Sequence, residues 1–135
     1  MEIANPYLVC SSLLFTVPLT LTAYNRQWLA YSACLLILAT SLVHHSMKHN
    51  ITYIIDITAC HYLAVVSLFY GFRYNVIYTV IPGTTYAVIV HYVGYQTKSL
   101  LFGSNTTFWN ASIHLAIALS ISYTSNSLGH IKNDV

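Results

Sequence analysis

The sequence predicts an all-α protein, a polytopic membrane helical bundle of about five transmembrane helices, and three observations lead to this prediction. First, 56% of the residues are hydrophobic and only 6% are charged, whereas soluble domains are about 25% charged. Second, five apolar runs of about 17–20 residues follow one another, each near the ~20 residues that a helix needs to cross a bilayer. Third, stretches such as 34–39 (Cys-Leu-Leu-Ile-Leu-Ala) lack the alternation that transmembrane strands require.

Short polar segments separate the five apolar runs. Pro18 inside the first run, and Pro82 followed by Gly83 inside the fourth, predict bends that membrane helices tolerate. Four helices is the alternative if the first or the fourth run does not span the membrane. The predicted single domain, 1–135, has helices over about 7–23, 28–46, 51–69, 76–95 and 107–123, and a polar C-terminal tail over 124–135.

Cationic side chains predict an orientation for this integral membrane protein. Lys48 and Lys98 fall on the side of the N-terminus, whereas Arg26, Arg73 and Lys132 fall on the opposite side. Because cytoplasmic loops carry an excess of Lys and Arg, the N-terminus is expected to be lumenal or extracellular and the C-terminus cytoplasmic. The net charge of +2 is spread singly along the chain, so the sequence predicts no nucleic-acid partner.

Polar side chains from four predicted helices fall at a similar depth near one membrane face. His45 ends the second helix, Asp56 begins the third, His91 lies near the end of the fourth and His114 near the start of the fifth. Ser41 lies four residues before His45 and shares its helical face. Ionisable residues inside membrane helices are costly and are usually paired or functional. The sequence therefore predicts a polar site, with a structural Asp–His network as the alternative.

Zinc suits this set of side chains. Neutral imidazoles and a carboxylate, or a water held by it, are ordinary zinc ligands. A catalytic zinc lowers the pKa of its bound water to about 7, and Asp56 could hold or deprotonate that water. Ser41 could donate a hydrogen bond to a developing oxyanion. A membrane lipid, reaching the site sideways, is the expected partner.

The same residues resemble a known superfamily of membrane hydrolases. Ser41-x-x-x-His45, Asp56 eleven residues later and a late helix containing His114 are similar to motifs of alkaline ceramidases, adiponectin and progestin receptors and haemolysin III proteins. The segment 40–49 looks like the end of the second haemolysin III helix. The resemblance covers about 40–70 and 107–121. It implies that His45 and His114 bind zinc, that Asp56 holds the zinc-bound water and that Ser41 is the active-site serine of a lipid amide or ester hydrolase.

The chain departs from this superfamily in two ways. The family has seven helices, and this chain has room for five. The family's last helix carries His-x-x-x-His, but here Asn110 stands at the first of these positions and His114 at the second. Asn is a poor zinc ligand, so we expect His91, at matching depth, to supply the third nitrogen.

Three functions follow as hypotheses. The first is a compact zinc-dependent hydrolase of a lipid amide or ester bond. The second is a catalytically degenerate relative that serves as a membrane scaffold or remodelling protein, which the short chain and Asn110 favour. The third is a small channel or transporter in which Asp56 and histidines line a pore; so short a chain would need a homo-oligomer to enclose it.

Overall fold

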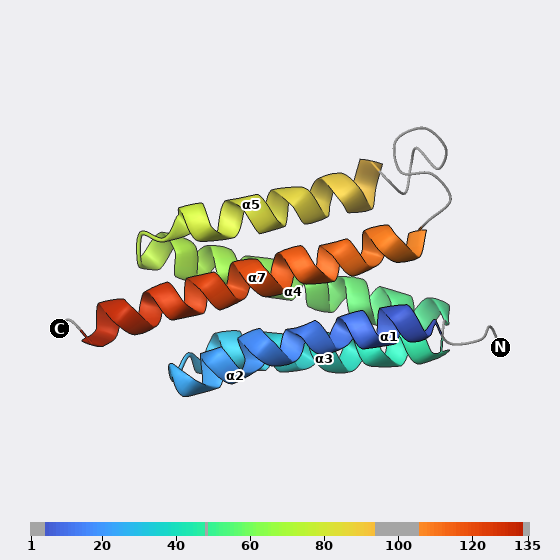
Figure 1. The fold of residues 1–135 in the computed structure, drawn as a ribbon, viewed down its shortest axis with the longest axis horizontal. Coiled ribbons are helices and arrows are strands. Elements are labelled where there is room, and N and C mark those ends of the chain that lie inside the picture. The colour runs from blue at the N-terminus through green and yellow to red at the C-terminus, as the bar shows by residue number, and fades with distance from the viewer. Residues whose placement is uncertain (1–4, 48, 94–105, 134–135) are drawn as a thin grey trace.

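A computed structural model describes residues 5–47, 49–93 and 106–133 of the chain, and these form helices joined by tight turns (Figure 1). No strand occurs within these ranges. In chain order the elements are α1 (Pro6–Ser12), the 3₁₀ turn η1 (Leu13–Phe15), α2 (Thr16–Tyr24), α3 (Trp28–Met47), α4 (Asn50–Arg73), α5 (Ile77–Val88), the π-helical turn η2 (Ile89–Val93) and α7 (Thr106–Asn133). The all-α class is therefore confirmed.

The helices form an up-and-down bundle of five rods, because α1, η1 and α2 continue one another and η2 continues α5 (Figure 1). The close contacts run in cyclic order: the first rod packs on α3, α3 on α4, α4 on α5, α5 on α7, and α7 returns to the first rod. α1 begins and α7 ends at opposite ends of the long axis (Figure 1), as an odd number of antiparallel rods requires.

Within the described part of the chain, three helical segments are long and apolar enough to cross a membrane: Pro6–Tyr24, Trp28–Met47 and Asn50–Arg73. Large apolar side chains such as Val17, Leu36 and Ile54 are exposed on their outer faces, where lipid would cover them. A tightly packed core of Phe15, Ala33 and neighbouring apolar residues lies inside the bundle. This arrangement indicates an integral membrane protein; which face is cytoplasmic stays a prediction.

Local chemistry explains where the first rod begins and changes pitch. Asn5 caps α1, its side-chain oxygen accepting from the backbone N–H groups of Tyr7 and Leu8, and Pro6 stands at the first helical position, where no N–H is needed. Pro18 cannot donate to the carbonyl of residue 14, and the chain tightens into η1 over this turn. A short 3₁₀ segment therefore lies just before the proline at which a bend is predicted.

The last helix is longer than predicted. α7 continues to Asn133, through much of the segment that the sequence analysis assigns to a polar tail over 124–135. The polar groups there have partners inside the bundle: the Ser125 carbonyl accepts from Asn25 Nδ2 at 2.9 Å and from Gln27 Nε2 at 3.2 Å, and Thr124 Oγ1 lies 2.7 Å from Thr79 Oγ1. Low hydropathy marks this segment as polar, but tertiary hydrogen bonds stabilise it as helix. The predicted loop 96–106 lies outside the described residues, except for Thr106.

Candidate functional site

Serine side chains from the first rod and α3 surround the imidazole of His114 on α7. Ser11 Oγ lies 2.8 Å from His114 Nδ1, and Ser41 Oγ lies 3.4 Å from His114 Nε2. Ser12 Oγ lies 3.1 Å from Ser41 Oγ and donates its hydrogen to the Leu8 carbonyl at 2.9 Å. Both ring nitrogens of His114 therefore face hydroxyl groups. The Ser–His cluster is defined as Ser11, Ser12, Ser41, His45 and His114.

The direction of these hydrogen bonds follows from the backbone. Ser11 Oγ donates its hydrogen to the carbonyl of Leu8 at 2.9 Å, so it accepts from His114 Nδ1–H. In the neutral imidazole Nε2 is then an acceptor, and Ser41 Oγ is the hydroxyl group nearest to it, at 3.4 Å. Through these contacts His114 joins three helical rods.

His45 completes the cluster by ring packing. Its ring centroid lies 5.3 Å from that of His114, and Phe15 packs edge-on against His114 from the other side, with centroids 5.6 Å apart. Ser41 and His45 are both buried in the bundle. Of the predicted site residues, Ser41, His45 and His114 therefore lie together.

Asp56 lies on the neighbouring helix and has a different partner. Its carboxylate is buried and accepts a hydrogen bond from Thr40 Oγ1, with the atoms 3.0 Å apart. Thr40 immediately precedes Ser41, but successive residues of a helix point in different directions. Asp56 thus supports the packing of α4 on α3, and its role with a metal-bound water stays a prediction.

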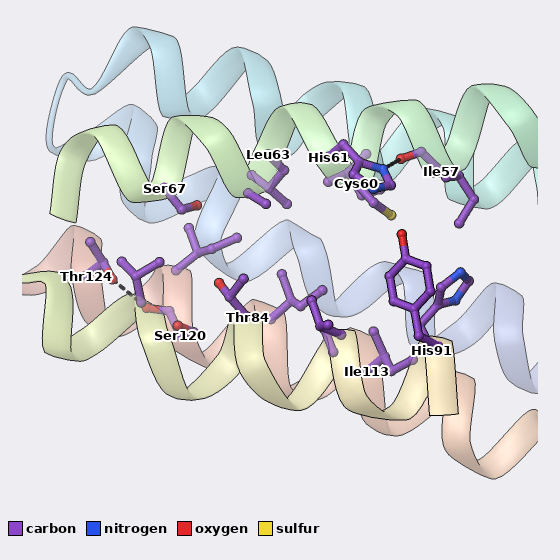
Figure 2. Close-up of a pocket in the computed structure, with 18 residues that line it drawn as sticks. Ile57, Cys60, His61, Leu63, Ser67, Thr84, His91, Ile113, Ser120 and Thr124 are labelled. Atoms are coloured by element: carbon purple, nitrogen blue, oxygen red, sulfur yellow. Dashed lines mark hydrogen bonds between the residues drawn. The ribbon is translucent and has the colours of Figure 1, made fainter. Parts of the chain in front are cut away.

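His91 faces a cavity of about 140 Å³ between α4, α5 and α7 (Figure 2). His61 and Cys60 of α4 line the same end as His91, and Ser67, Ser120 and Thr124 line the other end (Figure 2). Apolar side chains form most of the wall between them. None of the five members of the Ser–His cluster lines this cavity, and neither does Asp56.

The positions of His45, His91 and His114 decide whether the predicted zinc ligands can meet. Within the described ranges, no three His, Cys, Asp or Glu side chains are grouped so that they could hold a metal ion. His45 and His114 supply two imidazoles, whereas the third expected ligand, His91, lines the cavity. The side chains therefore do not fit a three-histidine zinc centre in this arrangement, and zinc stays a prediction.

Ser11 and Ser12 are not among the site residues predicted from the sequence. Two successive serines inside the first apolar run are a signal for interhelical hydrogen bonds in a membrane, and their distance from the N-terminus places them at the depth of His114. Their position in an otherwise apolar helix could have added them to the predicted set.

Comparison of the chain with family models, with curated proteins and with solved structures found no match. The resemblance to the ceramidase-like superfamily stays an expectation that rests on Ser41, His45, Asp56 and His114. The function of the chain is therefore inferred from two features, the Ser–His cluster and the cavity between α4, α5 and α7.

Proposed function

We propose that this chain is an integral membrane protein that binds the acyl chain of a membrane lipid in the cavity between α4, α5 and α7. The observation that carries the proposal is the apolar cavity of about 140 Å³. Apolar cavities of about 150 Å³ in other proteins stay dry and bind small apolar molecules. Lipid tails are as apolar as the cavity wall, so it is packing against a matching wall that favours a chain over an empty space.

The position of the cavity supports access from the bilayer. Its wall includes Val88 and Tyr92 of the fourth rod, which are 49% and 48% exposed, and the exposed side chain of His61 on α4. These side chains place an opening on the outside of the bundle, between α4 and α5. In a membrane this surface faces lipid tails, so an acyl chain enters without crossing water.

The separation of the cavity from the Ser–His cluster favours a non-enzymatic role. Ile113 lines the cavity, whereas the next residue, His114, is bonded to serines of the first rod and α3. Catalysis needs a reactive group within hydrogen-bond reach of the substrate. The cluster is instead placed to join helices, as in the scaffold hypothesis.

The test is the lipid content of protein purified in mild detergent. Ala64→Phe and Ala87→Phe each place a ring in the cavity wall, and Ala39→Phe, on an exposed position of α3, is the matched control. Because the added ring occupies the space and the packing contacts of the acyl chain, lipid per protein is expected to fall in both cavity variants and to stay unchanged in the control. Equal lipid content in all folded variants would refute the proposal.

A zinc-dependent lipid hydrolase is the second candidate, favoured by the meeting of Ser41, His45 and His114. Its test is zinc per protein after purification without chelators. The hydrolase requires close to one zinc, lost in His45→Ala and retained in His49→Ala, whose side chain is exposed in the turn before α4. Zinc-free wild-type protein would refute this candidate.

A further inference from the structure

We infer that the lipid bound in this cavity is an uncharged lipid alcohol, whose hydroxyl group donates a hydrogen bond to Nε2 of His61. The inference rests on the proposed lipid-binding function and specifies the chemistry at one end of the cavity. Three features of His61 and its surroundings carry it: its depth, its hydrogen bonding and the absence of charge on the cavity wall.

The depth of His61 in the bundle is unusual for an exposed imidazole. His61 is the twelfth of the 24 residues of α4, so it lies roughly 17 Å along the helix at 1.5 Å per residue. α4 is one of the segments long and apolar enough to cross a membrane, which places His61 near its midplane. Ionisable side chains at this depth almost always face a partner or a polar cavity, yet this one is exposed at the cavity mouth.

The backbone fixes which nitrogen of His61 is available. Nδ1 lies 2.7 Å from the carbonyl oxygen of Ile57 (Figure 2), and a carbonyl can only accept, so Nδ1 carries the hydrogen. In the neutral ring Nε2 is then an acceptor. The group on the ligand that matches it must be a hydrogen-bond donor. Among donors, a hydroxyl adds the smallest polar surface to an apolar molecule that has to reach this depth.

The rest of the wall excludes a charged headgroup. The residues lining the cavity include no Lys, Arg, Asp or Glu, so a phosphate, carboxylate or ammonium would have no counter-ion there and would lose its hydration. The titratable groups at the His61 end are Cys60, His91 and Tyr92, and His91 and Tyr92 pack edge-on with centroids 5.2 Å apart. The side chains that line this end are polar and include no Lys, Arg, Asp or Glu, which matches an alcohol.

The experiment compares two photoactivatable probes with the full chain in lipid nanodiscs. The first is a diacylglycerol with a diazirine in one acyl chain, and the second is the same molecule with its hydroxyl methylated. Wild-type protein is expected to be labelled roughly threefold to tenfold more by the alcohol than by the ether, the range that one net hydrogen bond supports. His61→Leu is expected to lower alcohol labelling to the ether level, and Thr58→Leu, on an exposed position of the same helix, is the control.

The outcomes separate this inference from the proposed function. If Ala64→Phe and Ala87→Phe abolish labelling by both probes while His61→Leu leaves the alcohol preference intact, the cavity binds lipid but the hydroxyl contact is overturned. If folded cavity variants label like the wild type, the proposed function itself fails. Cross-linking of the same nanodisc samples tests the alternative that a second copy of the chain, and not a lipid, contacts His61. If the wild type forms an oligomer that His61→Leu dissociates, and neither protein prefers the alcohol probe, the inference is overturned.

Discussion

The contact between α5 and α7 at Gly83 gives the most stringent test of the packing. A Cβ atom added to Gly83 would lie 2.6 Å from Ser120 Cβ, 2.9 Å from Ser120 Oγ and 3.1 Å from the carbonyl oxygen of Ala116. The first of these distances is too short for two carbon atoms that are not bonded to each other, and rotation of the Ser120 side chain does not move its Cβ. Gly83→Ala must therefore push α5 from α7 or displace Ser120.

Two opposing contributions set the size of the effect. Alanine is favoured over glycine inside a helix by about 1 kcal/mol. Overpacking costs about 1–3 kcal/mol, and displacement of Ser120 also weakens its 2.6 Å hydrogen bond to the Thr79 carbonyl, worth about 0.5–1.5 kcal/mol. The net expectation is that Gly83→Ala lowers the free energy of unfolding by roughly 0.5–3.5 kcal/mol, although helix propensity alone predicts a gain.

Unfolding in mixed detergent micelles, followed by tryptophan fluorescence, measures this difference. Ser120→Gly removes the Cβ and Oγ atoms that the methyl group added at position 83 would meet, so the double variant is expected to recover about 1 kcal/mol or more relative to the sum of the single effects. Wild-type stability in Gly83→Ala, or strict additivity in the double variant, would refute this packing of α5 on α7.

The remaining predictions concern the buried polar groups and use the same unfolding assay. Asp56→Asn is expected to change stability by less than about 1 kcal/mol, because an amide oxygen still accepts from Thr40; a loss of about 3 kcal/mol or more would mean that a paired charge is needed. Ser11→Ala removes the acceptor for the half-buried His114 Nδ1–H and is expected to cost about 1–2 kcal/mol. Ser41→Ala is expected to cost less, about 0.5–1 kcal/mol, since its contact with His114 Nε2 is 3.4 Å long and its other partner, Ser12 Oγ, keeps the Leu8 carbonyl as acceptor; a larger loss than in Ser11→Ala would contradict this ranking.

Much of the fold could be predicted because membrane helices are specified by composition and length. The starts of the second and third helices are confirmed within one residue, at Trp28 and Asn50, since each follows a polar turn. The end of α7 was not predicted, because Ser125 and its neighbours are polar in sequence and are held in the helix by Asn25 and Gln27, about a hundred residues away.

Residue order alone was enough to assign a depth to each polar group. Counting residues from the polar turns at one end of the bundle places His45 and His114 at the same depth along its axis, and their rings do lie against each other. The rotation of each helix about its own axis, in contrast, depends on contacts between helices. Side-chain packing and hydrogen bonding set that rotation, and they direct Asp56 to Thr40 and His91 to the cavity. Side chains at one depth can therefore face different neighbours. For this reason the predicted site residues are divided between the Ser–His cluster, the contact with Thr40 and the separate apolar cavity.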